Sequence, residues 1–266
     1  MKACFSTLGC PDWTTRQILA ALRGIGFAGL EVRGLEGEMN VPASPHLQPG
    51  SDFLRGLADS GCRVAVLGSS ASFSRPDEAL EECRAYVLAA AAIGCPIVRV
   101  FGGNLPEGRD RRETLALIGP ALRRASSFAS DHGVTIGLET HDAWCRGDEV
   151  AMVLEAVDHP ALGVIWDFHH SYRHGETPAA SLAAIGPGIL HVHLKDGFQR
   201  EGTVSYTLLG EGDLPLMGFL QGLKDIGYVG MLSLEWEKKW HPQLAEPELA
   251  FPLYKVELDR LLARLV

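Results

Sequence analysis

Short apolar runs alternate with longer segments of helical periodicity along the whole chain. Apolar, β-branched runs bounded by glycine or polar loops are typical of buried parallel strands. The strands we expect are residues 2–8, 28–33, 62–67, 97–101, 134–139, 162–167, 189–194 and 230–235. The helices we expect between them are residues 14–25, 51–60, 76–93, 110–132, 148–158, 178–186, 215–226 and 246–264. Strand-then-helix units repeated in this way predict the α/β class and a closed (β/α)8 barrel.

Glycines and charges mark several element boundaries. Asp77 and Glu78 follow Pro76 near the start of one predicted helix, and Gly94 closes it. Gly133 and Gly227 stand where helix C-caps are expected. No linker, repeat or low-complexity tract divides the chain, so we expect residues 1–266 to form a single domain. The first predicted strand is not followed by a dinucleotide-binding glycine fingerprint, and the chain has no Walker-type phosphate loop.

Four of the predicted strands end in side chains that suit a metal ion: Glu139, Asp167, His193 and Glu235. The carboxyl ends of parallel strands in a closed barrel open at one mouth, so these side chains are expected to meet there. Three carboxylates and one imidazole favour a single divalent cation, with Mn²⁺ as first choice and Mg²⁺, Co²⁺ or Zn²⁺ as alternatives.

The period of two along a strand places small residues beneath the acids. Gly137 shares a face with Glu139, Gly163 with Asp167 and Ser233 with Glu235, as expected of an inward-facing barrel interior. A charged carboxylate buried there needs a partner. That partner is a shared cation or, alternatively, a basic residue at the mouth, for which Arg33, Arg99 and Lys195 are candidates. Arg99 and Glu31 lie within strands and could form an ion pair beneath the metal.

Nearly the whole chain resembles the sugar phosphate isomerase/epimerase family, which comprises the xylose isomerase-like TIM barrels. Its relatives include ketose 3-epimerases, inosose isomerases and inosose dehydratases. The likeness rests on GLETHD, IWDFHH, HVHLKD and SLEWEKKWHP, which carry Glu139, Asp167, His193 and Glu235. It implies the barrel fold and the metal strongly, and the substrate only weakly.

Further residues near the strand ends are candidate catalytic or substrate-binding groups. The resemblance implies that His170, which closes the D-x-x-H motif, lies beside the substrate oxygens. A histidine three residues beyond a ligand Asp could also polarise a carbonyl or stabilise an enediolate. Where ketose 3-epimerases carry a further Glu, this chain has Cys145, so ketose specificity is not transferred. The substrate-binding candidates are Lys195, His141, Glu31, Arg99, Trp13 and Trp240.

Several of these candidates have a second, purely structural interpretation. Lys195 could form a salt bridge to Glu235, and His141 could cap its loop. Trp13 and Trp240 could line the pocket and stack on a sugar, or they could pack against helices. The LGEG sequence at residues 208–211 could bind an anion, but we favour a tight turn in which Asp213 caps the following helix.

The expected function is a metal-dependent isomerase or epimerase acting on a keto-sugar or inosose through a metal-bound enediolate. Glu139 and Glu235 would exchange protons with carbon, Asp167 and His193 would mainly hold the ion, and His170 would stabilise the enediolate oxygen. The same chemistry allows a lyase or dehydratase acting on a keto-inositol or 3-keto-glycoside. A non-catalytic carbohydrate-binding protein is a remote alternative.

Composition narrows the range of partners. The net charge of −9 argues against a nucleic-acid surface. Predicted strand ends LGSS, FGG and the segment VSYT lack the extra histidines of the related endonuclease IV family, which argues against a DNA-repair nuclease. The six cysteines are scattered, and no signal peptide or membrane span is evident. We therefore expect a cytoplasmic protein of carbohydrate metabolism with a small-molecule sugar or inositol-derived substrate, no membrane partner and, on the resemblance, a homo-oligomeric assembly.

Overall fold

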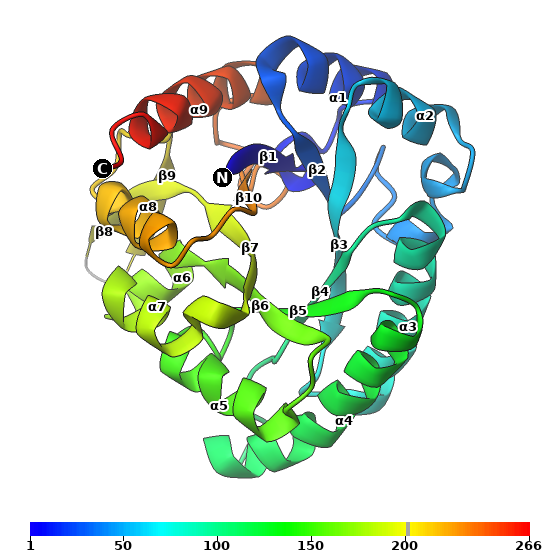
Figure 1. The fold of residues 1–266 in the computed structure, drawn as a ribbon, viewed down its shortest axis with the longest axis vertical. Coiled ribbons are helices and arrows are strands. Elements are labelled where there is room, and N and C mark those ends of the chain that lie inside the picture. The colour runs from blue at the N-terminus through cyan, green and yellow to red at the C-terminus, as the bar shows by residue number, and fades with distance from the viewer. Residues whose placement is uncertain (201–202) are drawn as a thin grey trace. The chain divides into compact units, whose positions relative to one another are not determined.

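The computed structural model describes residues 1–200 and 203–266. Eight parallel strands form a closed barrel in the order β1-β10-β7-β6-β5-β4-β3-β2, which confirms the predicted (β/α)8 architecture (Figure 1). These strands are β1 (Lys2–Ser6), β2 (Gly29–Val32), β3 (Arg63–Ser72), β4 (Ile97–Phe101), β5 (Thr135–Glu139), β6 (Leu162–Asp167), β7 (Ile189–Leu194) and β10 (Met231–Leu234). Residues along β5, β6, β7 and β10 are almost all buried, as expected of strands covered on both faces.

The helices fall in the predicted intervals between strands. They are α1 (Thr15–Ala21), α2 (Asp52–Asp59), α3 (Pro76–Ile93), α4 (Arg111–Asp131), α5 (Gly147–Val157), α7 (Pro178–Ile185), α8 (Leu216–Asp225) and α9 (Pro247–Leu262). Gly94 caps α3 with a φ of 70°, and Gly133 and Gly227 take φ values of 69° and 73° just beyond α4 and α8. The left-handed conformation expected at these glycines is therefore confirmed.

Two compact units make up the chain. The first comprises residues 1–65 and 192–266, and the second comprises residues 66–191. In the first, β1 pairs with β2 and β10, and the register continues from Ser233 to His193 on β7. In the second, β3, β4, β5 and β6 pair in sequence, with Arg99 opposite Gly137. The expectation of a single domain stays a prediction.

Several elements lie outside the predicted strands and helices. Helix α6 (Phe168–Arg173) begins directly after β6, and β8 (Asp196–Arg200) pairs with β9 (Thr203–Thr207) in an antiparallel hairpin. The hairpin lies in the stretch 195–214 that we expected to be a loop, whose residues 201–202 are outside the described part. Strand β3 also extends to Ser72, beyond its predicted end at residue 67, through an irregularity between Gly68 and Ser72.

In the second unit α3 contacts α4, and α4 contacts α5, along the green part of the ribbon in Figure 1. All six cysteines are free and buried. Among the described residues, no helix is both long and apolar enough to cross a membrane.

Candidate active site and metal centre

In the second unit, Glu139 ends β5 next to a buried arginine. Its carboxylate Oε2 lies 3.2 Å from Nη1 of Arg99, and both side chains are almost fully buried. The Arg99 Nη2 group also donates to the Ser69 carbonyl at 3.0 Å, which fixes the guanidinium in place. Arg99 therefore holds in place a carboxylate, the kind of group that binds a divalent metal or accepts a proton.

The register of β4, β5 and β6 explains why small residues lie beneath the acids. Arg99 on β4 is the partner of Gly137 on β5, and Glu139 is the partner of Ile165 on β6. A Cβ atom at Gly137 would come within 2.7 Å of the Ile165 side chain. Glycine is therefore required because Ile165 already fills the space that a side chain at position 137 would need.

Asp167 ends β6 and starts the next helix. Its Oδ1 accepts a hydrogen bond from the His170 backbone N–H at 3.1 Å, which is an N-cap contact for α6. Its Oδ2 lies 3.5 Å from Nε2 of the same histidine. The short helix thus turns His170 back over the carboxylate, a position that the D-x-x-H spacing had suggested.

A second histidine joins this group. His141 packs its ring against those of Phe101 and His170, each at a centroid distance of 4.7 Å. One ligand atom from each of Glu139, His141 and His170 lies within 4.8 Å of the others, so these residues form a candidate metal-binding or polar substrate cluster inside the second unit. The Nδ1 of His141 lies 2.9 Å from Asp142, so capping of its own loop and a place in the cluster are compatible.

Cys145 serves a packing role in the same loop. Its thiol donates to the Asp142 carbonyl at 3.0 Å, and burial raises its pKa to about 11. The thiol is therefore neutral near pH 7 and cannot replace the carboxylate that ketose 3-epimerases carry at this position.

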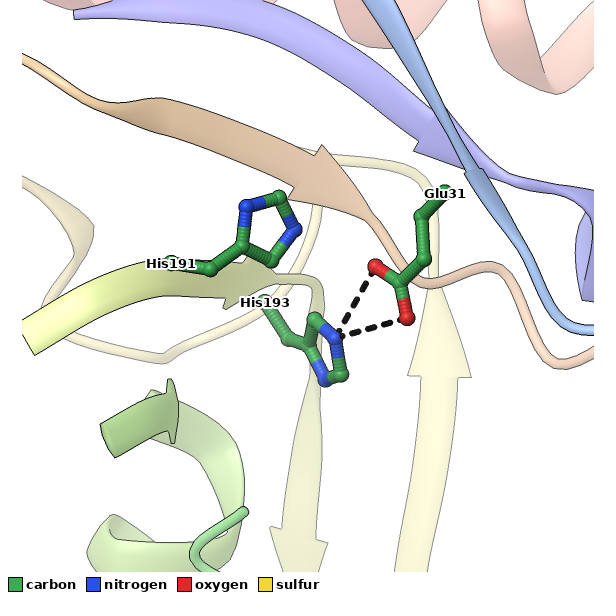
Figure 2. Close-up of side chains that lie close together, drawn as sticks. All are labelled: Glu31, His191 and His193. Atoms are coloured by element: carbon green, nitrogen blue, oxygen red, sulfur yellow. Dashed lines mark hydrogen bonds and ion pairs between the residues drawn. The ribbon is translucent and has the colours of Figure 1, made fainter. Parts of the chain in front are cut away.

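In the first unit, His193 on β7 lies between two carboxylates. Its Nε2 is 3.1 and 3.0 Å from the two oxygens of Glu31 (Figure 2), and its Nδ1 is 3.4 Å from Oε2 of Glu235. Two atoms bound to one cation at about 2.1 Å each lie roughly 3 to 3.5 Å apart, so the separation of Nδ1 and Oε2 suits shared coordination. His191 is also labelled in Figure 2, and one of its ring nitrogens lies within 4.8 Å of ligand atoms of Glu31 and His193.

Lys195 forms the salt bridge to Glu235 that the sequence suggested as its structural interpretation. Its buried ammonium donates to Oε2 of Glu235 at 2.6 Å and to Oε1 of Glu237 at 2.7 Å. Tyr206, delivered by the β8–β9 hairpin, donates its hydroxyl to the same Glu237 oxygen at 2.9 Å. The face shared by Glu235 and Glu237 is visible in the sequence, but nothing in it indicated that Tyr206 would reach this network.

The glycine-rich turn after the hairpin is closed by an internal carboxylate. Asp196 accepts hydrogen bonds from the backbone N–H groups of Gly197, Gly210 and Gly212 at 2.8 to 3.0 Å. These donors are therefore already used within the turn, which supports the tight-turn interpretation of residues 208–211. The predicted helix cap at Asp213 is wrong, because α8 begins at Leu216 after Pro215 and has no side-chain cap.

The two aromatic substrate candidates differ in their surroundings. Trp13 is buried against Phe251, and its indole N–H donates to Glu248 at 2.7 Å, so packing accounts for its position. Trp240 is 53% exposed after β10 and its ring is accessible to a ligand.

The residues of each unit suit a divalent cation. In the first unit the carboxylates of Glu31, Glu235 and Glu237 surround one ammonium and one imidazole. In the second, Glu139 pairs with the Arg99 guanidinium, and Asp167 lies 3.5 Å from the His170 ring. Buried carboxylates in excess over cationic side chains are stabilised by a bound metal. Oxygen donors with one nitrogen match Mn²⁺, Mg²⁺ or Zn²⁺ better than a thiolate-bound structural zinc.

Known proteins share this architecture. The chain is 31% identical over 168 residues to an uncharacterised Methanocaldococcus jannaschii protein, covering 58% of this chain and 55% of that one, so this match spans about half of that relative. It is 25% identical over 253 residues to an L-ribulose 3-epimerase from Methylomonas, covering 90% of this chain and 84% of that one. The structure of the IolI protein with a bound zinc atom matches 100% of this chain and 99% of that chain with a TM-score of 0.84 at 16% identity.

Other relatives are named as 3-dehydroshikimate dehydratase and 2-oxo-tetronate isomerase. Isomerases, epimerases and dehydratases that act on small molecules therefore occur among the relatives. The family described as xylose isomerase-like TIM barrel matches residues 19–252. Together with the closed barrel, this match shows that the chain belongs to the xylose isomerase-like TIM barrel family.

Proposed function

We propose that the protein is a divalent-metal-dependent isomerase or epimerase acting on a keto-sugar or an inosose. Glu139, Asp167, His193 and Glu235 would hold the ion. The observation that carries the proposal is that two strand-terminal glutamates, Glu139 and Glu235, are each buried against one cationic side chain. In each pair the cationic side chain fixes the position of a carboxylate that would bind the metal or accept a proton.

A bound divalent cation would act as a Lewis acid that acidifies the C–H bond next to a substrate carbonyl. Glu139 and Glu235 come from strands that are not neighbours in the barrel order, which suits contact with opposite faces of a substrate. One would remove the proton from carbon and the other would return one, which inverts that carbon in an epimerisation. Glu139 would accept the proton, and Arg99 would hold its carboxyl group in place.

Polar side chains beside the glutamates would bind the substrate oxygens. His170 lies over Asp167, and its ring contacts that of His141, so the two imidazoles form a surface suited to hydroxyl or enediolate oxygens. Lys195 is held between Glu235 and Glu237, with its charge fixed beside the second base. We assign it to orienting Glu235 and to contacting a substrate hydroxyl. Trp240 would supply an aromatic face for the sugar ring.

The ion we propose is Mn²⁺, with Mg²⁺, Co²⁺ and Zn²⁺ as alternatives. Carboxylate-rich ligand sets with one imidazole accept all four, and the zinc atom in the IolI structure supports a divalent ion in a protein of this fold. Elemental analysis of protein purified without added metal would identify the ion that the protein acquires.

A second candidate function is elimination from the same enediolate, as in a dehydratase or in a lyase that cleaves a 3-keto-glycoside. The specific support is the 32% identity over 124 residues to the 3-dehydroshikimate dehydratase of Pseudomonas putida, although this covers only 19% of that relative. Loss of a β-hydroxyl needs a general acid near the leaving oxygen, and His170 or His141 is placed among the polar groups of the second unit for that role.

Deuterium exchange tests both functions. The metal-loaded protein would be incubated in D₂O with a panel of ketoses, inososes and keto-glycosides and followed by NMR. Incorporation of deuterium with a retained carbon skeleton supports the isomerase or epimerase, whereas release of water or aglycone supports the lyase. Saturable binding of a sugar with neither exchange nor elimination would show a carbohydrate-binding protein and refute both enzymatic proposals.

A further inference from the structure

We propose that Glu31 is a positioning residue for His193: its carboxylate holds the imidazole with the proton on Nε2, so that the lone pair on Nδ1 is directed to the cation. The inference rests on the proposed function, because His193 is one of the four metal ligands assigned above. It replaces a direct substrate contact as the role of Glu31.

The first step is the bidentate contact drawn in Figure 2. Both carboxylate oxygens of Glu31 lie within hydrogen-bond distance of one ring nitrogen, Nε2 of His193, at 3.1 and 3.0 Å. An ionised carboxylate can only accept hydrogen bonds, and a neutral imidazole has one N–H group. The proton of a neutral His193 is therefore placed on Nε2, where Glu31 accepts it.

The second step follows from the shape of the ring. With Nε2 protonated, Nδ1 carries the lone pair, and Nδ1 is the atom that lies 3.4 Å from Glu235 Oε2. The nitrogen able to bind a metal thus faces the second ligand carboxylate, and the protonated nitrogen faces Glu31. A carboxylate that accepts from the far nitrogen of a metal-bound histidine orients the ring and strengthens its basicity.

Burial supports a positioning role over a substrate contact. Glu31 lies inside β2, opposite Ser6 on β1, and neither Glu31 nor His193 is exposed. A substrate at the barrel mouth would have to displace a fully buried hydrogen-bonded pair to reach it. Burial of a carboxylate without compensation costs several kcal/mol, so the charge is retained where it has a fixed hydrogen-bonding task.

His191 offers a competing arrangement. Ligand atoms of Glu31, His191 and His193 lie within 4.8 Å of one another, so these residues could hold a cation of their own. In that case Nε2 of His193 would bind the ion and carry no proton. The bidentate hydrogen-bond geometry at Nε2 favours the positioning role, and the two arrangements predict opposite tautomers.

The test combines ¹⁵N NMR of histidine side chains with Mn²⁺ titration. In the metal-free wild type, with the signal assigned by its loss in H193Q, His193 should be the Nε2–H tautomer. In E31Q the side-chain amide can donate to Nε2, so the tautomer should shift toward Nδ1–H. The Kd for Mn²⁺ should rise roughly 10- to 100-fold, as for other partners of metal-bound histidines, while the circular dichroism spectrum stays unchanged.

A matched control comes from the loop that follows β2. Glu36 also accepts hydrogen bonds, from the backbone N–H and hydroxyl of Thr15, but it is largely exposed. E36Q removes one negative charge from the same part of the chain and should leave both the His193 tautomer and the Kd for Mn²⁺ unchanged.

Separate outcomes would overturn the inference and the proposed function. An Nδ1–H tautomer in the metal-free wild type, or E31Q binding Mn²⁺ as tightly as wild type, overturns the role of Glu31 and leaves the metal proposal intact. Loss of one of two bound ions in E31Q would make Glu31 a ligand. If the wild type binds no divalent ion, the proposed function fails. The tautomer measurement still shows whether Glu31 accepts the Nε2 proton of His193. If E31Q does not fold, the role of Glu31 is tested by the His193 tautomer in the wild type and by the Kd of E31D for Mn²⁺.

Discussion

At the scale of single residues, the site is organised by fixed pairs of polar side chains. Arg99 holds Glu139, Lys195 holds Glu235, and Glu31 holds His193. Each pair joins a residue proposed to touch metal or substrate with a neighbour that sets its charge or orientation. Substitutions that preserve shape and alter charge should therefore reduce activity without unfolding the protein.

Glu139→Gln tests the proposed base. It removes the proton acceptor and keeps the side-chain volume, so deuterium exchange should fall by about 10²- to 10⁴-fold, with an unchanged circular dichroism spectrum. Exchange is measured by NMR at saturating metal. The control is Glu155→Gln on the exposed face of α5, which should keep full activity. Full exchange in Glu139→Gln would remove Glu139 from the proton-transfer step.

The buried thiols predict a loss of stability at alkaline pH. The pKa of Cys145 is raised from 9.0 to about 11 by burial, so the folded state retains a proton that the unfolded state loses. Its contribution to stability is complete below pH 9 and is lost as the pH rises toward 11. Urea unfolding at pH 8 to 10.5 should show a shallower decline for Cys145→Ser than for wild type, and equal slopes would contradict this linkage.

At the scale of elements, the loops after β6 and β7 carry structure that positions side chains. Helix α6 turns His170 over Asp167, and the β8–β9 hairpin brings Tyr206 to Glu237. Asp196 ties the hairpin to the glycine-rich turn through backbone N–H groups from both. These elements belong to the site, because they hold side chains that strand ends alone would not place.

Asp196→Ala should loosen the hairpin and its turn. The variant leaves the N–H groups of Gly197, Gly210 and Gly212 without their acceptor. A fully buried donor left unsatisfied costs about 1–3 kcal/mol, and the contacts of Gly210 and Gly212 are only partly buried and cost less. We expect a loss of roughly 2–4 kcal/mol in the free energy of unfolding and faster hydrogen exchange at these glycines. Asp213→Ala, an exposed position in the same turn, is the control and should stay near wild type. Unchanged exchange at Gly210 and Gly212 would show that Asp196 does not hold the turn.

At the scale of the whole molecule, the closed barrel brings together the carboxyl ends of strands that are far apart in the sequence. The four proposed metal ligands come from β5, β6, β7 and the residue directly after β10. Parallel strands in a barrel direct their carboxyl ends to one mouth, which is the reason that distant segments can contribute to one site.

Metal binding should therefore stabilise the folded chain. At a free Mn²⁺ concentration 100 times its Kd, a single site adds about 2.7 kcal/mol, which corresponds to a rise in Tm of roughly 5–10 °C for a chain of this size. Calorimetry with and without EDTA measures this shift. The double variant Glu139→Gln/Asp167→Asn should lose most of it. A wild-type Tm that does not respond to Mn²⁺ would argue against a site formed only in the folded state.

Local patterns account for most of the fold. The strands and long helices lie within a few residues of their expected ranges, because apolar periodicity, prolines and glycine caps act over short stretches of chain. The sequence pattern missed α6 and the β8–β9 hairpin, since FHHSYR is too short for a helical period and DGFQR, the first strand of the hairpin, does not alternate. It also predicted Asp213 as the N-cap of α8, whereas this stretch belongs to the turn held by Asp196 and α8 begins only at Leu216.

By itself the sequence determined the barrel class, the strand-terminal acids and histidine, and the small residues that leave space beneath them. Tertiary structure alone decided which charges became partners: Arg99 with Glu139, Lys195 with Glu235 and Glu237, and Glu31 with His193. The physical reason is that hydrophobic periodicity fixes the direction of each strand and the face on which a residue lies. The pairing of buried charges depends on distances of a few ångströms across strands, which are set only when the strands align in register.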